Sequence, residues 1–453
     1  MFDLIVLGGG PAGYLAAERA GEAGLTTALI EKNKIGGVCL NEGCIPSKTL
    51  LNSAKIYEHA KHGQVYGVTA EQVTIDAAAV VKRKNKVVTK LVSGIRATLK
   101  ARKVTIYSGH GTVVDRKDGV IRVSVNDEIL EGRQLLIATG SEAIVPPIPG
   151  VREGLDAGRV LTNREILDLE AIPESLVIIG GGVIGLEMAA YYGTCGSQVT
   201  VVEMLDHIAG NADREISTVL QKAFEKQGIV FHLNSRVTRV DNESVHFENS
   251  EGSHTVKADK VLLSVGRKPV TQDIGLENIN VHLERGHIVT DRQGLTNVPN
   301  VFAAGDVNGI WMLAHAAYRE AEVAVNTMLG RKDIMRYQAM PSVIYTQPEM
   351  AFVGETEETC QEKGIHYKKV VLPMNFSGRY MAENEGGTGL IKLIVDQDKD
   401  CVIGCHLLGG YASEIILTAG VIIEAEMKIS DVKELIFPHP TVSEIIREAI
   451  FHI

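Results

Sequence analysis

The sequence has few cysteines for its length, no long apolar run and no cluster of basic residues. Six cysteines in 453 residues are too few for the disulfide framework of a small secreted protein. No stretch reaches the ~18 uninterrupted apolar residues of a membrane span, and the N-terminus lacks the features of a signal peptide. The net charge of −10 argues against a nucleic-acid binder. We therefore expect a cytoplasmic protein of three or four domains without membrane or nucleic-acid partners.

A repeated pattern of strand, glycine-rich turn, helix, strand and acid is the most informative feature that is present. Both copies contain a GxGxxG motif and a later acid: Gly8, Gly10, Gly13 and Glu31 in the first, and Gly180, Gly182, Gly185 and Glu203 in the second. Corresponding residues are 172 positions apart. Such glycines let backbone N–H groups approach a pyrophosphate, and the acid accepts hydrogen bonds from ribose hydroxyls. The repeat predicts two dinucleotide sites, and a glutamate in the second favours NAD over NADP.

The rest of the chain divides into segments of different periodicity. We expect a long amphipathic helix over 76–103, a β-rich meander over 104–137, a helix over 212–228 and short strands over 229–265. After Pro341, strands at 351–353, 369–372, 389–395 and 402–408 precede two helices. The expected fold class is therefore α/β, with two Rossmann-like dinucleotide-binding domains and a C-terminal α+β domain.

Two cysteines, Cys39 and Cys44, stand five residues apart in the segment GGVCLNEGCIPSK. In a regular helix their Cα atoms would be about 8–9 Å apart, whereas a disulfide needs roughly 4.4–6.8 Å. A bond between them would require a distorted turn, which Gly43 allows. From the residues alone, the pair can be two buried thiols, half of a metal site, a structural disulfide or a redox-active one.

Further motifs follow one another along the chain, and with the two repeats they resemble those of the flavin-dependent pyridine-nucleotide disulfide oxidoreductases. They are GGVCLNEGCIPSK (36–48), ATGS (138–141), SVGRKP (264–269), FAAGD (302–306), MLAH (312–315) and HPTVSE (439–444). The resemblance is greatest to the members that oxidise protein-bound dihydrolipoyl groups and reduce NAD. It implies one FAD per chain on the first repeat, and NAD as co-substrate on the second.

The resemblance also assigns residues to each cofactor. Beside FAD, in addition to the first repeat, it places Lys48, Gly111, Thr139, Gly140, Ser141, Asp306, Met312, Leu313, Ala314 and His315. Beside NAD, in addition to the second repeat, it places Glu187, Val237 and Gly266. Lys48 is expected near the flavin N5, paired with Glu187. Asp306 is expected on the ribitol or phosphates, although alone it would also suit a helix N-cap.

The same resemblance implies the catalytic residues. Cys39 and Cys44 are expected to form a redox-active disulfide, with Cys39 exchanging with substrate and Cys44 lying against the flavin. A metal site is not expected, because two cysteines lack the further ligands that zinc needs. His439, held extended between prolines, is the expected base, and Glu444 is expected to orient it. Thr441 and Glu444 also match a capping box for the last helix.

Two departures from the family pattern stand near these residues. Val38 replaces a common threonine, and Phe437-Pro438 stands where many relatives have another histidine, which leaves His439 as the one candidate for the base. The effect of either departure on the thiol chemistry does not follow from the sequence.

The resemblance finally implies the domains and partners. We expect an FAD-binding domain at 1–142 that is completed by 270–337, an NAD-binding domain at 143–269, and an interface domain at 338–453. The chain is expected to form a homodimer in which each base serves the disulfide of the other subunit. A lipoyl-bearing acyltransferase or a glycine-cleavage carrier protein is the expected partner. The alternatives are another NAD(P)-linked flavin disulfide reductase and a non-catalytic flavoprotein subunit.

Overall fold

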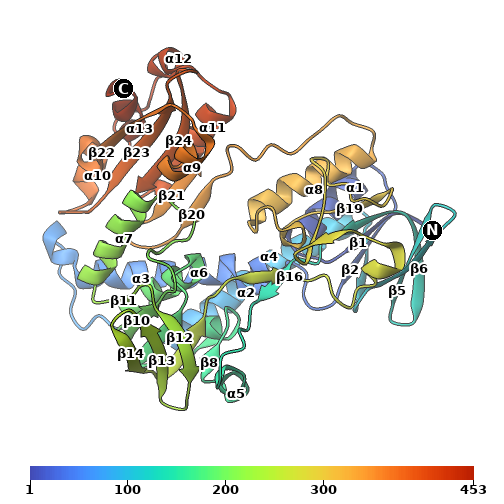
Figure 1. Cartoon of the computed structure of the whole chain (residues 1–453), viewed down its shortest axis with the longest axis horizontal. Helices are drawn as coiled ribbons and strands as arrows, with labels where there is room; N and C mark the ends of the chain where they lie inside the picture. The colour runs from blue at the N-terminus through green and yellow to red at the C-terminus, as the bar shows by residue number, and fades with distance from the viewer. The chain divides into compact units, whose positions relative to one another are not determined.

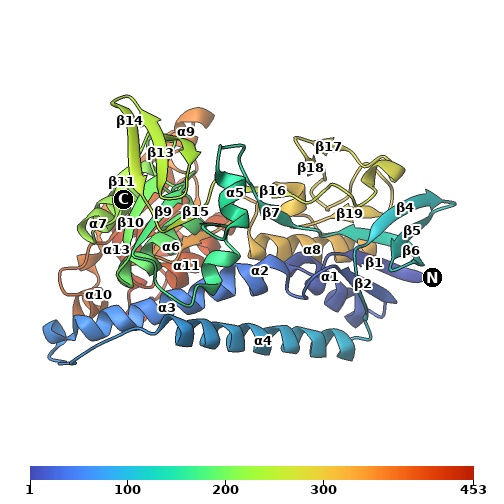
Figure 2. The same ribbon diagram turned by 90° about the horizontal axis from the view of Figure 1, so that it is seen from below.

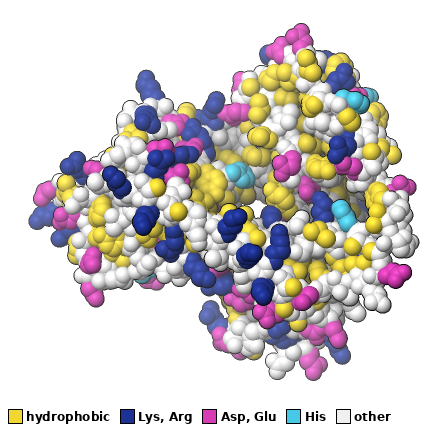
Figure 3. Space-filling model, turned by 180° about the vertical axis from the view of Figure 1, so that it is seen from behind, with side chains coloured by type: hydrophobic (Ala, Val, Ile, Leu, Met, Phe, Trp, Pro, Cys, Tyr) yellow, Lys and Arg dark blue, Asp and Glu magenta, His cyan; other side chains and the backbone are white.

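The computed structural model describes residues 1–453 and has the mixed α/β fold expected from the sequence. The chain forms two compact units, which comprise 1–49, 81–144 and 266–336 in the first and 50–80, 145–265 and 337–453 in the second. The finer division into three domains stays a prediction. None of the helices combines the length and apolar character needed to cross a membrane. Acidic and basic side chains are interspersed over the face drawn in Figure 3.

The first unit contains a seven-stranded sheet of order β3-β2-β1-β6-β5-β4, with β19 paired to β6. The strands β3, β2, β1, β6 and β19 are parallel, whereas β4, β5 and β6 form the expected antiparallel meander. Helices α1 and α8 run side by side along the sheet (Figure 1). The main elements are β1 Phe2–Leu7, α1 Pro11–Glu22, β2 Thr27–Glu31, α2 Gly37–Glu42, β3 Thr105–Ser108, β4 Thr112–Lys117, β5 Val120–Val125, β6 Glu128–Ile137, β7 Ser141–Ala143, β16 Arg267–Pro269, η3 Leu276–Ile279, β17 Leu283–Glu284, β18 His287–Ile288, β19 Val301–Ala303, η4 Asp306–Asn308 and α8 Ala314–Met328.

Strand β1 separates two hydrophobic clusters in this unit. Its alternate side chains point to opposite faces, so Leu4 and Val6 pack with alanines of α1 and α8, whereas Ile5 and Leu7 pack with the meander strands. Small residues on α1 and α8 let the two helices approach closely. This packing fixes the N-terminus of α1 at the end of β1.

The second unit contains three sheets: a parallel one of order β11-β10-β9-β15-β8 (Figure 2), and antiparallel ones of order β12-β13-β14 and β20-β21-β24-β23-β22. Two helices, α3 Cys44–Lys61 and α4 Ala77–Ala101, have residues in both units. The other elements are η1 Gly63–Tyr66, α5 Val151–Asp156, β8 Val160–Leu161, η2 Glu165–Asp168, β9 Ser175–Ile179, α6 Val183–Thr194, β10 Gln198–Val202, α7 Arg214–Lys226, β11 Val230–His232, β12 Arg236–Val240, β13 Ser244–Asn249, β14 Gly252–Lys257, β15 Lys260–Leu263, β20 Ser342–Ile344, β21 Met350–Gly354, α9 Glu357–Lys363, β22 Tyr367–Pro373, η5 Met374–Phe376, α10 Gly378–Glu383, β23 Leu390–Asp396, β24 Cys401–Leu408, α11 Ala412–Glu424, α12 Ile429–Lys433 and α13 Glu444–Phe451.

The helices predicted over 76–103 and 212–228 are α4 and α7, and the four predicted C-terminal strands are β21 to β24. The expectation of two helices after these strands was wrong, because α11, α12 and α13 follow β24. Helix α12 has five residues, which is too short to show a helical period in the sequence.

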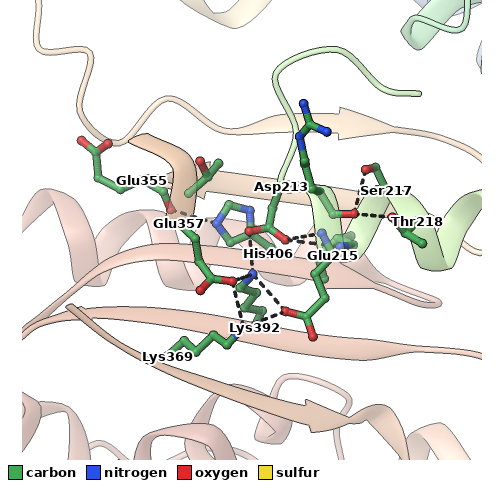
Figure 4. Close-up of polar contacts among 12 residues, drawn as sticks. Asp213, Glu215, Ser217, Thr218, Glu355, Glu357, Lys369, Lys392 and His406 are labelled. Carbon is green, nitrogen blue, oxygen red and sulfur yellow. Dashed lines mark hydrogen bonds and ion pairs between the residues drawn. The ribbon is translucent and has the colours of Figure 1, made fainter. Parts of the chain in front are cut away.

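A buried ion cluster joins α7 to the C-terminal sheet within the second unit (Figure 4). Lys392 of β23 contacts three carboxylates, with Nζ 2.8 Å from Asp213, 3.1 Å from Glu215 and 2.5 Å from Glu357. Asp213 also accepts the backbone N–H groups of Glu215 and Ile216 and thereby caps α7. One buried carboxylate thus begins a helix and binds the cation of a neighbouring sheet.

Candidate active site

The two glycine-rich turns have the same internal contacts, which explains the first and third glycines of each motif. A Cβ atom on Gly13 would lie 1.8 Å from the carbonyl oxygen of Gly8, and one on Gly185 would lie 2.4 Å from that of Gly180. Gly8 and Gly180 also have positive φ values, of 109° and 105°. Glycine is therefore needed at these four positions for α1 and α6 to pack against their own turns.

Packing within the fold does not explain the middle glycine of each motif. A Cβ atom on Gly182 would meet nothing within 4 Å, and one on Gly10 would meet only Gly37 Cα at 3.8 Å. Their φ values of −75° and −78° suit any residue. The space left by the missing side chains lies at the N-termini of α1 and α6, where backbone N–H groups bind a pyrophosphate. These residues fit a dinucleotide at each turn.

The acid at the end of each second strand is held in the same way in both repeats. Glu31 accepts the N–H groups of Gly9 and Asn33, both at 2.7 Å. Glu203 accepts those of Gly181 at 2.6 Å and Leu205 at 2.7 Å. Each carboxylate oxygen has a second lone pair, which remains available to a ribose hydroxyl. The fixed carboxylates therefore suit the role that the sequence predicted.

The two cysteines lie on either side of a break between helices. Helix α2 ends at Glu42, Gly43 has non-helical φ and ψ values of −151° and −113°, and α3 begins at Cys44. The bend expected at Gly43 is therefore confirmed. No disulfide bond joins Cys39 to Cys44 in this structure. Their mutual hydrogen bond and then burial raise the pKa of Cys39, whereas the charge of Lys48 acts in the opposite direction. The raised pKa disfavours the Cys39 thiolate, which is the form that thiol–disulfide exchange uses.

Asp306 is the acceptor of a buried network in the first unit. The Ser141 hydroxyl donates to Asp306 Oδ2, and Arg267 donates to Ser141 through Nε to the hydroxyl and through a terminal nitrogen to the carbonyl oxygen, both at 2.7 Å. Gly305 occupies the N-cap position of η4 without any side-chain cap. The interpretation of Asp306 as a helix N-cap was therefore wrong, because its carboxylate is bound to Ser141 instead.

The other residues assigned to FAD lie in the same unit as this network. Thr139 donates to the carbonyl oxygen of Val270 at 2.6 Å, and Gly140 has a φ of +71°. Gly111 is packed so tightly that a Cβ atom would lie 2.4 Å from Leu7 Cδ1. The segment Met312, Leu313, Ala314 and His315 leads into α8, which begins at Ala314. All of these residues belong to the first unit.

The residues assigned to NAD differ in their contacts and in the unit to which they belong. Glu187 is buried and accepts the N–H of Tyr345 at 3.1 Å. Val237, a residue of β12, has its side chain buried in the core with 7% of its surface exposed, which leaves its backbone as the part able to face a ligand. Gly266, with a φ of +103°, belongs to the first unit. The pairing of Lys48 with Glu187 stays a prediction.

His439 and Glu444 are in contact in the second unit. His439 Nδ1 lies 3.0 Å and 3.2 Å from the two carboxylate oxygens of Glu444, while most of the histidine side chain is exposed. Glu444 also accepts the N–H of Thr441 at 2.8 Å. This backbone hydrogen bond and, after it, the one from His439 lower the pKa of Glu444 despite some burial. An ionised Glu444 holds the Nδ1 proton, so Nε2 is left as the basic nitrogen.

The predicted capping box at Thr441 is only half formed. The backbone N–H of Thr441 binds Glu444 as a capping box requires. However, helix α13 begins at Glu444 with Ser443 at the N-cap position. The Thr441 hydroxyl donates to the carbonyl oxygen of Pro438 at 2.8 Å. Thr441 is therefore not the N-cap, because its side chain closes the preceding turn.

Comparisons with known proteins agree with this arrangement of motifs. The sequence pattern described as "Pyridine nucleotide-disulphide oxidoreductase" matches residues 2–321, and its dimerisation-domain pattern matches residues 340–450. The chain belongs to the pyridine nucleotide-disulphide oxidoreductase family. Its expected place in that family is therefore confirmed.

Several relatives in this family are similar over their whole length. A dihydrolipoyl dehydrogenase of Mycoplasma pneumoniae is 37% identical over 451 residues, which cover 99% of this chain and 97% of that protein. A mitochondrial dihydrolipoyl dehydrogenase of Pisum sativum is 38% identical, with 99% and 90% covered. The crystal structure of LpdA from Mycobacterium tuberculosis superposes with a TM-score of 0.90 at 27% identity, with 99% of each chain covered. The HOCl-induced flavoprotein disulfide reductase RclA from Escherichia coli, in its Cu(II) complex, gives 0.87 at 28% identity, with 100% of this chain and 99% of that one covered.

Enzymes of this family are FAD-dependent oxidoreductases, and the dihydrolipoyl dehydrogenases among them use NAD as co-substrate. The open space beside Gly10 and Gly182, with the fixed Glu31 and Glu203, fits these two cofactors. No group of three or more His, Cys, Asp or Glu side chains is arranged to hold a metal ion.

Three features of the site were not assigned from the sequence. Arg267 stands inside the recognised SVGRKP motif, so its basic character was the available signal. Glu320, a buried acid of α8 that accepts the backbone N–H of Gly305 at 2.6 Å, gave no signal, because it resembles any acid on an amphipathic helix. The hydroxyls of Tyr14 and Tyr318 lie 2.5 Å apart. Burial raises the pKa of both phenols; their hydrogen bond raises the pKa of Tyr14 and lowers that of Tyr318, and the nearby thiols raise both. That pairing joins residues 304 positions apart.

Proposed function

We propose that the protein oxidises protein-bound dihydrolipoyl groups to lipoyl groups and reduces NAD, as the dehydrogenase component of a 2-oxo acid dehydrogenase or glycine-cleavage system. One observation carries the proposal: the adjoining Cys39 and Cys44 thiols stand in a chain that is similar from end to end to dihydrolipoyl dehydrogenases. Two neighbouring cysteines suit a dithiol substrate, because in thiol–disulfide exchange a thiolate of one molecule attacks a disulfide sulfur of the other.

The proposed chemistry begins with the Cys39–Cys44 disulfide. A substrate thiolate attacks the Cys39 sulfur, the bond between the two cysteines breaks, and Cys44 leaves as a thiolate. The second substrate thiol then closes the lipoyl ring, and Cys39 leaves as a thiol that carries the proton of this second group. Two electrons have moved from the substrate to the cysteine pair. His439 takes the substrate proton at Nε2, because Glu444 fixes the proton on Nδ1.

The cofactor-binding residues complete this proposal. FAD, when bound, accepts the electron pair from the dithiol and delivers it to NAD as a hydride. The two glycine-rich turns hold the pyrophosphates, and Glu31 and Glu203 hold the riboses. Asp306 holds the ribitol or phosphates, and Lys48 lies at the flavin. The carboxylate of Glu203 disfavours a 2′-phosphate, since a like charge would be buried beside it.

A homodimer is part of the proposal. The dimerisation-domain pattern covers residues 340–450, and large apolar side chains are exposed on that segment: Leu417 at 65%, Val421 at 55% and Ile436 at 97%. Exposed apolar side chains in such number are typical of a surface that associates. In the proposed dimer, each subunit supplies His439 to the disulfide of the other. The further partner is a lipoyl-bearing acyltransferase or a glycine-cleavage carrier protein.

Cysteine variants test the proposal. Cys39→Ser and Cys44→Ser should each lose turnover of free dihydrolipoamide but should keep NADH oxidation with ferricyanide, which needs only the cofactor sites. Cys195→Ser is the matched control, since Cys195 lies outside every motif and should keep both activities. Normal dihydrolipoamide turnover in either of the first two variants would contradict the proposal. Faster wild-type turnover with glutathione disulfide than with lipoamide would favour the alternative reductase.

A further inference from the structure

Glu320 is a buried acid in α8 that the proposed chemistry does not use. Its residue exposure is 3%. One carboxylate oxygen, Oε2, accepts the backbone N–H of Gly305 at 2.6 Å and the side-chain amide of Asn308 at 2.9 Å. These two donors stand on either side of Asp306. A single carboxylate therefore binds both ends of the segment that carries the aspartate.

The segment between Gly305 and Asn308 follows a path that depends on these hydrogen bonds. Gly305 has a φ of +78°, and a Cβ atom there would lie 3.3 Å from Ala317 and 3.4 Å from Ala12. The backbone therefore passes closely between α8 and α1. Asn308 also accepts the N–H of Ile310 at 3.0 Å through Oδ1, so its amide orientation is fixed from both sides. Its NH₂ group must face Glu320.

Asp306 is consequently fixed from two directions. Ser141, itself bound by Arg267, holds its side chain. Glu320 binds the backbone N–H of Gly305 before it and the side chain of Asn308 after it. Burying a carboxylate is costly unless charge-assisted hydrogen bonds compensate for its lost hydration. A neutral glutamine of the same shape would have less to lose on burial. A buried acid at this position therefore indicates that its stronger hydrogen bonds are used to fix the Gly305–Asn308 segment.

We infer that Glu320 is a positioning residue for FAD, which holds the Gly305–Asn308 segment so that the Asp306 carboxylate faces the cofactor. The inference rests on the proposed function in one respect, namely that Asp306 binds FAD. The inference adds Glu320, which binds the segment from the side opposite to Ser141 and does not itself touch the cofactor.

The substitution Glu320→Leu tests this, because leucine fills much of the same space but accepts no hydrogen bond. Gly305 and Asn308 would both lose their acceptor, since both donate to Oε2 of Glu320. We expect FAD to dissociate about 10- to 100-fold faster, the usual effect of losing charge-assisted hydrogen bonds. The visible circular dichroism of the bound flavin should also change. Both are measured on the purified full-length holoenzyme.

The conservative variant Glu320→Gln separates positioning from general damage. Its amide oxygen can take the place of Oε2 and accept both the Gly305 N–H and the Asn308 amide, although the charge is lost. FAD release and the dichroism signal should therefore return toward wild type. The control Glu322→Gln changes an exposed acid on the same helix that pairs with surface arginines, and it should release FAD at the wild-type rate.

The outcomes decide between explanations. Wild-type FAD retention in a folded Glu320→Leu variant would overturn the inference. So would a Glu320→Gln variant that releases FAD as fast as a folded Glu320→Leu variant. Where Glu320→Leu fails to fold, Asn308→Ala removes one of the two hydrogen bonds instead, and wild-type FAD retention in that variant would overturn the inference. Fast release in Glu320→Leu or Asn308→Ala, with retention in Glu320→Gln, supports it. A wild-type protein that is purified and reconstituted without any bound flavin would instead refute the proposed function.

Discussion

Replacing Lys392 with methionine measures how strongly the buried ion cluster joins α7 to the C-terminal sheet (Figure 4). The Lys392 side chain is 1% exposed and that of Asp213 is 0% exposed. Methionine is similar in length and apolar, so the substitution removes the cation while filling most of the same space. The main effect is therefore to leave the Asp213 carboxylate buried without a cation.

The magnitude follows from what each carboxylate retains. Breaking a buried ion pair by removing one partner typically costs about 3–5 kcal/mol. Glu215 and Glu357 keep a second cation, because Lys369 Nζ lies 3.3 Å and 2.9 Å from them. Asp213 keeps only the two backbone donors of the α7 cap. We therefore expect a loss of roughly 3 kcal/mol, near the lower end of that range, and expect Asp213 to account for most of it.

Amide hydrogen exchange on the FAD-saturated protein is the suitable assay, because a chain of several domains need not unfold in one step. Exchange in the first turn of α7 and in β23 should become faster in Lys392→Met. Lys369→Met is the matched control, since its exposed ion pairs are worth about 0–1 kcal/mol. Adding Asp213→Asn to Lys392→Met should recover most of the loss, because asparagine still caps α7 and no unpaired charge remains.

Two results would refute this reasoning. Equal, small effects of Lys392→Met and Lys369→Met would show that the cluster does not hold α7 to the sheet. A double variant no better than Lys392→Met would show that lost packing, rather than the unpaired charge of Asp213, causes the effect.

Three further predictions concern other parts of the chain. Gly182→Ala should fold normally but raise the KM for NADH at least ~10-fold, whereas Gly185→Ala should lower the melting temperature, because its Cβ would overlap the Gly180 carbonyl. His439→Gln should slow dihydrolipoamide turnover by roughly 10²–10⁴ and leave NADH oxidation by ferricyanide unchanged; normal lipoamide turnover would place the base elsewhere. Burial raises the pKa of Glu357, but Lys392 and Lys369 outweigh burial and lower the pKa from 4.5 to about 2. The ionised Glu357 should therefore stabilise the fold fully above pH 4.5, and this stabilisation should disappear toward pH 2. As the pH is lowered, the urea midpoint should fall less in Glu357→Gln than in wild type.

The parts of the fold that depend on local pattern could be predicted from the sequence. The two dinucleotide-binding turns are specified within about 25 residues each, and the structure repeats their contacts. Gly13 and Gly185 pack on their own turns, and Glu31 and Glu203 accept equivalent backbone N–H groups. Short-range steric requirements of this kind leave a fixed spacing in the sequence. The length of α4 was likewise visible from its period.

Contacts between residues far apart in the sequence, in the candidate site and in the ion cluster, could not be predicted in this way. Arg267 binds Ser141 across 126 residues, and Lys392 binds Asp213 across 179. Nothing in either sequence neighbourhood specifies the partner, because the contact depends on how sheets and helices pack. Thr441 shows the same limit over a short distance. Its spacing to Glu444 satisfied the capping-box pattern, but its hydroxyl bound Pro438 instead.

The thiol pair shows why a distant residue is needed at all. The hydrogen bond between Cys39 and Cys44, together with burial, raises the pKa of Cys39. Exchange needs a thiolate, so a raised pKa makes a base from elsewhere more important. His439 is the proposed base; Glu444 accepts from its Nδ1 and is itself fixed by the N–H of Thr441. The carboxylate that begins the last helix therefore also determines which nitrogen of the proposed base is free to accept a proton.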